Sequence, residues 1–337
     1  MIETRVKRKR WLSLVISAIV LIISMMINLM VGEYPLSLKE IGQTFLGLGD
    51  AASQLILLEF RLPRLMITLF AGIALSLSGA ILQSMTRNPL AEPGILGINA
   101  GSGFAIALFI AIGRVKADDF VYMLPIVSLI GGLVVTLFIF YFSYQGEQGL
   151  SPASMVLVGI GLSAALSGGA LTIISTFDKS QSEFISTWLA GNIWGDTWPF
   201  VWAFLPWLVI MIPIILYQSE ILNILSTDDL VARALGISLN RQRFILVIMA
   251  VLLSSVAVSV AGAIGFIGLM GPHIARTIIG PRHQSFLPLA MMIGAILLII
   301  SDTVGQTLIQ PSGMPAGIVV AILGAPYFLY LMYRVRR

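Results

Sequence analysis

The sequence predicts an all-α polytopic membrane protein with about ten transmembrane helices and both termini in the cytoplasm. Three observations predict this class. Apolar residues make up 58% of the chain and the mean hydropathy is +0.97. The apolar runs recur at the length that spans a bilayer, about 20 residues. Basic residues occur at both ends of the chain and mostly in alternate loops. A soluble globular class is therefore excluded.

The apolar runs predict the spans in chain order. The first run follows a basic segment but is too long for a signal peptide and lacks a small-residue cleavage site, so we expect it to stay as a span. The loops are too short to form a soluble domain, and we expect a single transmembrane domain over residues 1–337. The predicted spans are 11–31, 65–83, 95–112, 121–142, 153–174, 199–217, 244–261, 263–279, 286–302 and 314–333.

The Lys and Arg residues predict the orientation. An even number of spans places both termini on one side, and both carry basic residues, at 5–10 and 334–337. Of the 20 Lys and Arg residues, 14 fall on the side of the termini and six on the other, which places the termini in the cytoplasm. The basic residues are spread over many loops, so we expect lipid around the chain and no nucleic-acid partner.

Several kinds of chemistry are excluded by residue type. The chain has no cysteine and two histidines, so it lacks thiolate metal sites, thiol catalysis and an imidazole metal cluster. None of the five lysines follows a glycine, so the phosphate-binding loop G-x-x-x-x-G-K-[ST] is absent. No HExxH motif is present either, which leaves an intramembrane enzyme with little support. If ATP drives this protein, the nucleotide site belongs to a separate subunit.

A cation-coupled carrier is the alternative from another class. Such carriers keep ionisable residues at mid-membrane to bind the coupling ion. Here only Glu92 and Asp302 lie near spans, both close to span ends, and we expect backbone groups or water to satisfy them. Two results together would favour this alternative: uptake by the unchanged protein that needs no ATPase, and loss of that uptake in an Asp302→Asn variant.

The polar segment 218–243 predicts a short helix that needs a partner. Ser226 is the expected N-cap, Asp229 follows at capping-box spacing, and Gly236 ends the helix. Leu230, Val231, Ala234 and Leu235 form its apolar face. A helix of about two turns is unstable alone in water. We therefore expect it to dock on a soluble protein that pushes on the membrane segment.

Four segments of the chain carry a resemblance to a known family: RLPRLMITLFAGIALSLSGAILQSMTRNPLAEPGILGINAGSGFA (61–105), DLVARALGI (229–237), VAGAIGFIGLMGPHIAR (260–276) and PAGIVVAILGAPYF (315–328). They resemble the permease subunits of type II ABC importers for ferric siderophores, haem and vitamin B12. The resemblance extends from about residue 30 to the end of the chain. It implies a second permease, identical or paralogous, two cytoplasmic ABC ATPases and an extracytoplasmic substrate-binding protein. It also implies that the protein lies in the bacterial cytoplasmic membrane. This chain would then bind no cofactor, and ATP would be hydrolysed on a separate subunit.

The resemblance also implies roles for individual residues. Arg61 and Arg64 would receive acidic side chains of the binding protein, although Gln306 stands where some members have a further basic residue. Headgroup anchoring is the alternative for both arginines. The segment 218–243 would be the coupling segment that docks on the ATPase. Its implied contact residues are Asp228, Asp229, Ala232, Arg233, Leu235 and Gly236.

A cytoplasmic gate and a pathway are implied as well. The gate falls at Asn88 and Leu90, with a second constriction at Ser151, Pro152 and Ala153. Pro152 and Ala153 depart from the hydroxylated residues of the vitamin B12 type. A stripe of small residues, Gly159, Ser163 and Ser167, would line the pathway or allow close helix packing. The expected cargo is a ferric siderophore, with vitamin B12 or haem as the alternative.

Overall fold

The computed structural model describes residues 2–113, 123–144, 151–177, 179–308 and 313–335. The elements are α1 (Ile2–Met30), α2 (Leu38–Phe45), α3 (Ala51–Gln54), the π-helix η1 (Leu55–Arg61), α4 (Leu62–Thr86), α5 (Ile98–Gly113), α6 (Met123–Ser143), α7 (Pro152–Ile174), α8 (Lys179–Leu189), α9 (Trp198–Tyr217), α10 (Ser219–Leu225), α11 (Asp229–Ala234), α12 (Leu239–Ala261), α13 (Ile267–Ile279), α14 (His283–Leu308) and α15 (Ala316–Val335). Each of the ten predicted spans contains a helix, which confirms the all-α polytopic class, although 95–97 and 263–266 are not helical and 121–122 lie outside the described residues.

Eight helices in the described part of the chain are long and apolar enough to cross a bilayer. The remaining two predicted spans are α5, with 16 residues, and α13, with 13 residues. At 1.5 Å per residue α13 is only about 20 Å long, less than the hydrocarbon core of about 30 Å. The turn 262–266 that precedes α13 therefore lies inside the bundle, where its backbone groups need partners from the protein.

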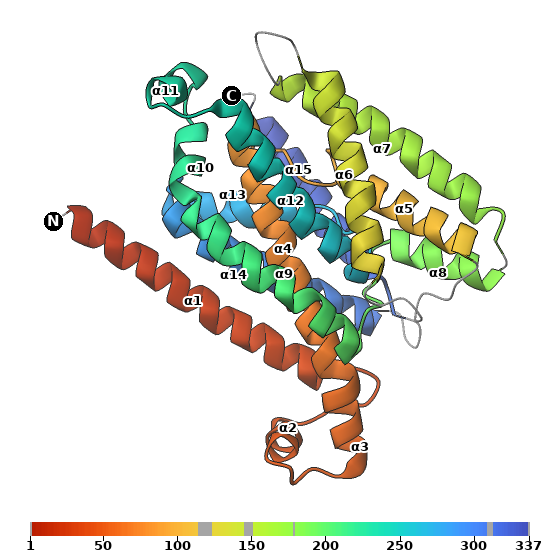
Figure 1. The fold of residues 1–337 in the computed structure, drawn as a ribbon. Helices are drawn as coiled ribbons and strands as arrows, with labels where there is room; N and C mark the ends of the chain where they lie inside the picture. Colours follow the sequence, from red (N-terminus) through yellow and green to blue (C-terminus); the bar gives the residue numbers. More distant parts are fainter. Residues whose placement is uncertain (1, 114–122, 145–150, 178, 309–312, 336–337) are drawn as a thin grey trace.

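The longest helical rod lies at the centre of the bundle (Figure 1). α3, η1 and α4 run on continuously over residues 51–86, and α4 packs against α12, α13 and α14. Small residues permit these contacts: a Cβ added to Gly79 would lie 1.8 Å from the backbone oxygen of Gly268, and one added to Gly72 would lie 2.6 Å from that of Gly294. The central packing therefore depends on backbone-to-backbone contact rather than on large side chains.

A side chain of α9 replaces a hydrogen-bond donor that Pro63 removes at the end of the π-helix η1. In η1 the Leu62 N–H donates five residues back, to Leu57 O. Pro63 has no N–H to continue this pattern, so the Leu58 carbonyl oxygen would be left without its donor. The indole Nε1 of Trp198 on α9 donates to that oxygen at 3.0 Å. Sequence reasoning placed the start of this span near residue 65 and missed η1, α2, α3 and α8.

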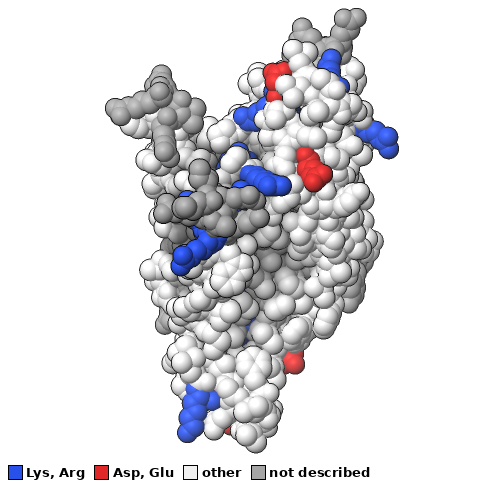
Figure 2. All heavy atoms as spheres, turned by 90° about the vertical axis from the view of Figure 1, so that its left-hand side faces the viewer, with Lys and Arg blue, Asp and Glu red and all other residues white. Residues whose placement is uncertain are grey.

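The bundle has two chemically different ends, named here by the helices they carry. At the α11 end lie α10, α11 and the C-terminal end of α15, and at the opposite α2 end lie α2 and α3 (Figure 1). α2 begins with a capping box in which Ser37 and Glu40 bond reciprocally, and these hydrogen bonds lower the pKa of Glu40. On the face shown in Figure 2, charged side chains concentrate in the upper part and at the lower tip of the molecule, with a largely uncharged band between them.

Candidate functional site

The predicted short helix exists as α11, but its N-cap is not Ser226. Ser226 is the C-cap of α10, where its hydroxyl donates to Leu222 O at 2.8 Å. Asp228 caps α11 instead, because its carboxylate accepts from the Leu230 N–H at 2.8 Å. The capping prediction for Ser226 was therefore wrong: a second helix, α10, uses that residue first. The predicted stop is confirmed, since Gly236 has a φ of +79° directly after the helix.

The apolar face of α11 points away from the chain. Leu230, Val231 and Leu235 have exposed fractions of 76%, 49% and 62%. Arg233 and Gly236 are exposed beside them, whereas Ala232 is buried against the chain with an exposed fraction of 1%. Of the predicted coupling residues, Ala232 is thus turned inward, whereas Asp228, Arg233, Leu235 and Gly236 are exposed. Exposed leucines on a two-turn helix outside the spans favour a protein partner at this place.

Asp229 faces inward and binds two arginines. Its Oδ1 accepts from Nη2 of Arg243, on α12, at 2.7 Å and from Nη2 of Arg87, at the end of α4. Arg243 is almost fully buried, with 4% of its side chain exposed. Arg87 is the C-cap of α4 and has left-handed backbone geometry, with a φ of 53°. Sequence reasoning missed both pairs: Arg87 and Asp229 lie 142 positions apart, and Arg243 and Asp229 lie 14 positions apart on two different helices.

The predicted gate residues lie close together at the α11 end. Asn88 follows Arg87, and its Oδ1 accepts from the Leu90 N–H at 2.9 Å, which forms a tight turn. Ser151 caps α7, and its hydroxyl oxygen accepts from the Ser154 N–H at 3.4 Å. Asn88 and Ala153 both line an open cavity of about 530 Å³ with Thr86, Val156, Leu157 and Ile160. Pro152 is the first residue of α7.

The stripe of small residues on α7 packs against a loop rather than a helix. A Cβ on Gly159 would lie 2.9 Å from Cα of Leu96, and the Ser163 hydroxyl donates to Gly94 O at 3.3 Å. Ser167, one turn further, is exposed. The first two residues of the stripe therefore hold the segment 94–97, which continues from the gate turn at Asn88, and the third does not.

Glu92 joins this segment to the buried turn before α13. Its Oε2 accepts from the Phe266 N–H at 2.8 Å, and 6% of the residue is exposed. Phe266 has a φ of 65°, unusual for a residue with a side chain, and the hydrogen bond helps to hold it there. Glu92 lies in a loop outside the spanning helices, and burial raises its pKa to about 7 against the lowering effect of the Phe266 N–H. The expected backbone partner for Glu92 is confirmed.

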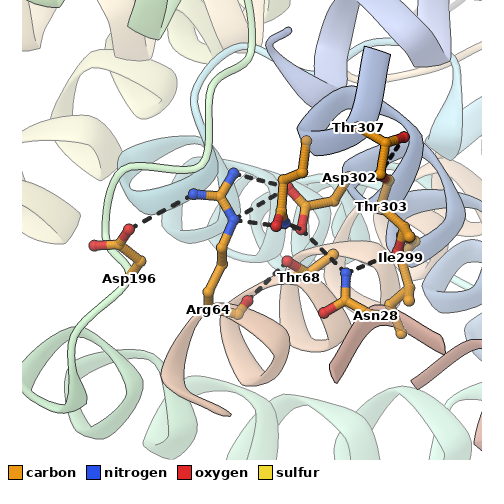
Figure 3. Close-up of polar contacts among 9 residues, drawn as sticks. Asn28, Arg64, Thr68, Asp196, Ile299, Asp302, Thr303 and Thr307 are labelled. Carbon is orange, nitrogen blue, oxygen red and sulfur yellow. Dashed lines mark hydrogen bonds and ion pairs between the residues drawn. The ribbon is translucent and has the colours of Figure 1, made fainter. Parts of the chain in front are cut away.

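A second polar cluster occupies the α2 end (Figure 3). Arg64 donates from Nη2 to Oδ1 of Asp302 at 2.8 Å, and Asp302 has an exposed fraction of 1%. Asp302 also accepts from Gln306 Nε2 at 2.6 Å and from Asn28 Nδ2 at 3.4 Å. The expectation that backbone or water satisfies Asp302 was wrong, because side chains from α1, α4 and α14 converge on it. The hydrogen bonds to Asp302 therefore join α1, α4 and α14.

The two arginines predicted to dock a binding protein are both engaged within the chain. Arg61 donates to the backbone oxygens of Leu29, at 2.6 Å, and Tyr34, at 2.5 Å. Arg64 reaches a second carboxylate, that of Asp196, at 3.6 Å, and it lines a cavity of about 450 Å³ with Glu33, Asn192 and Gln306. Asp196 is 44% exposed. The docking role stays a prediction, and a partner carboxylate would have to compete with Asp196 for Arg64.

Three comparisons with known proteins all match this chain to transport proteins. A family model described as the FecCD transport family matches residues 20–334. The iron(3+)-hydroxamate import system permease protein FhuG of Bacillus subtilis (strain 168) is 38% identical over 325 residues, which are 95% of this chain and 96% of the relative. The Fe(3+)-citrate import system permease protein YfmE of the same organism is 37% identical over 329 residues, 98% and 97% of the two chains. A solved structure described as an inward-facing conformation of a metal-chelate type ABC transporter superposes with a TM-score of 0.81 at 30% identity, and the match covers 96% of this chain and 99% of that one.

Proposed function

Because the chain belongs to the FecCD transport family, we propose that it is the permease subunit of an ATP-driven importer that carries a ferric siderophore across the bacterial cytoplasmic membrane. The observation that carries this proposal is the similarity, over nearly the whole chain, to permeases named for iron(3+)-hydroxamate and Fe(3+)-citrate import. The bundle of apolar helices supports a multi-pass membrane location. Vitamin B12 or haem is the alternative cargo.

The proposed assembly has four kinds of component. This chain and a second permease, identical or paralogous, enclose the pathway, and the face of α7 that is left uncovered within the chain is proposed as part of their interface. One of the two ABC ATPases binds α11 of this chain through Leu230, Val231 and Leu235, and the other binds the second permease. A substrate-binding protein docks at the α2 end, which faces outward, and both termini lie in the cytoplasm. ATP hydrolysis takes place on the ATPases, and we propose no cofactor for this chain.

The proposed cycle moves the chain without covalent chemistry on it. The binding protein delivers the cargo, ATP binding displaces α11, and the gate around Asn88 and Ala153 opens or closes. The cavity between these two residues supports a gate at this end of the bundle. A cation-coupled mechanism is disfavoured because Asp302 is occupied by Arg64, Gln306 and Asn28.

Uptake measurements test the proposal. Cells that lack the gene and cells with it restored are supplied with radioactive iron on several defined siderophores, and with labelled vitamin B12 and haem in parallel. We expect loss of uptake confined to one siderophore class. Loss of uptake confined to vitamin B12 or haem would contradict the proposed siderophore cargo but not the proposed assembly. In proteoliposomes, uptake that needs no ATPase and stops when the cation gradient is collapsed would contradict the proposal.

A pair of substitutions tests whether α11 docks on the ATPase. Leu235→Asp places a charge on its exposed apolar face, and it should leave the permease in the membrane but prevent it from retaining the ATPase. Ile237→Ala, on the half-buried residue after the stop, serves as a control that shortens an apolar side chain outside the helix. Normal co-purification of the ATPase with the Leu235→Asp variant would contradict the docking assignment.

A further inference from the structure

We propose that Asp229 transmits the movement of α11 to the gate by holding Arg87 and Arg243, and that it does not bind the ATPase. The inference rests on the proposed function and assigns a positioning role within it. Asp229 is the first residue of α11 and belongs to the segment expected to dock. Its carboxylate, however, is turned toward the rest of the chain, away from the exposed face that Leu230 and Leu235 form.

The first step is the anchor at Arg243. This residue lies on α12 with 4% of its side chain exposed, and among the described residues its Nε has no hydrogen-bond partner. A buried guanidinium needs a compensating anion, and the carboxylate of Asp229 lies 2.7 Å from its Nη2. Displacing α11 alone would strip this charge of its partner, so α11 and the start of α12 are expected to move as one unit.

The second step is the contact with the gate. The same Oδ1 of Asp229 accepts from Nη2 of Arg87, which ends α4. Arg87 adopts a left-handed backbone conformation that a residue with a side chain keeps only where its surroundings hold it. Asn88 follows directly and forms the turn to Leu90, so the position of Arg87 sets the start of the gate loop.

The third step is the division of roles on α11. The exposed residues Leu230, Val231 and Leu235 can bind a partner without any contribution from the inward-facing carboxylate. Two ion pairs on one carboxylate join α4, α11 and α12 by interactions that are stronger than neutral hydrogen bonds. Loss of Asp229 should thus separate two events that are otherwise coupled: ATPase binding should persist, while gating should fail.

The test compares Asp229→Asn with Asp229→Glu in a reconstituted complex of the permease with its ATPase and binding protein. Asp229→Asn keeps the shape and removes the charge. We expect the ATPase to co-purify normally, whereas uptake and the stimulation of ATP hydrolysis by loaded binding protein fall at least about fivefold, as for loss of a typical coupling between sites. Asp229→Glu keeps the charge and should recover part of the loss. Glu220→Gln, an exposed acidic residue on α10, is the matched control and should behave as the wild type.

A cross-link provides the second variant. Because the chain has no cysteine, an Arg87→Cys/Asp229→Cys variant carries a unique thiol pair. Joining the thiols with a short bis-methanethiosulfonate reagent, verified by mass spectrometry, should raise uptake at least about fivefold over the reduced variant, and dithiothreitol should reverse the gain. The single-cysteine variants with the same reagent should show no gain.

Three results would overturn the inference. Unchanged uptake in Asp229→Asn would show that the ion pairs are not needed. Loss of the ATPase from that variant would make Asp229 a docking residue, and a verified cross-link that restores nothing would remove Arg87 from the transmission. Each of these leaves the proposed function standing, because the wild-type complex still imports. Failure of the wild-type complex itself to import would instead contradict the proposed function.

Discussion

Replacing Asp302 with Asn should destabilise the protein by about 3 kcal/mol. Asp302 has an exposed fraction of 1% and accepts from Arg64 Nη2 at 2.8 Å and from Gln306 Nε2 at 2.6 Å. Removing one partner of a buried ion pair costs about 3–5 kcal/mol because the other charge stays buried. Arg64 is 23% exposed and keeps Asp196 at 3.6 Å, so the lower end of that range applies.

Unfolding by titration with a denaturing detergent in mixed micelles measures this difference. Asp196→Asn is the matched control, because it removes the exposed carboxylate from the same arginine and should cost only about 0–1 kcal/mol. A double variant, Arg64→Met with Asp302→Leu, replaces both charges by apolar groups and should recover most of the lost stability. Equal costs for Asp302→Asn and Asp196→Asn would refute the reasoning. So would full stability of Asp302→Asn together with a complete loss of uptake, which would favour ion coupling at this carboxylate.

Three further substitutions have defined outcomes. Gly79→Ala places a Cβ 1.8 Å from a backbone oxygen and should lower Tm sharply. Gly161→Ala, whose Cβ meets no atom within 4 Å, should keep or raise Tm. Equal changes in Tm for the two variants would contradict the packing argument. Trp198→Phe removes the donor to Leu58 O and should cost about 1 kcal/mol of unfolding free energy, and a neutral effect would mean that water replaces the indole. Glu92 has its pKa raised from 4.5 to about 7, so the folded state loses stability as the pH rises through that interval. Glu92→Gln should therefore raise Tm above pH 7 but not below pH 4.5, and a gain independent of pH would contradict the shift.

Much of the fold could be predicted from the sequence because the bilayer imposes a length on each span. Every predicted span contains a helix, and the stop at Gly236 follows from a local conformational preference. The errors arose where two local explanations competed. Ser226 can begin α11 or end α10, and its hydrogen bond to Leu222 O shows that it does the second. The short helices α2 and α8 have no span-length signal and were missed.

The contacts of the charged residues could not be predicted in the same way. Arg64 pairs with Asp302 across 238 positions and Arg87 with Asp229 across 142, and no periodicity or cap links such distant residues. The topology brings them together only when the helices between them have packed. A resemblance can indicate that Arg64 and Asp229 matter, but it cannot distinguish a side chain that meets a partner from one that meets its own chain.

This distinction changes how the two ends of the protein are understood. An importer has to be held together against the movement that ATP drives, and it has to transmit that movement. At the α2 end, Arg64 and Asp302 hold α1, α4 and α14 in one unit. At the α11 end, Asp229 joins α11 to α4 and α12 while the leucines of α11 remain free for a partner. Both ends therefore use an inward-facing carboxylate, buried at Asp302 and 34% exposed at Asp229, to fix helices, and leave the contact surface to other groups. A substitution at either carboxylate should impair transport without abolishing partner binding, whereas a substitution on the apolar face of α11 should abolish ATPase binding and transport together.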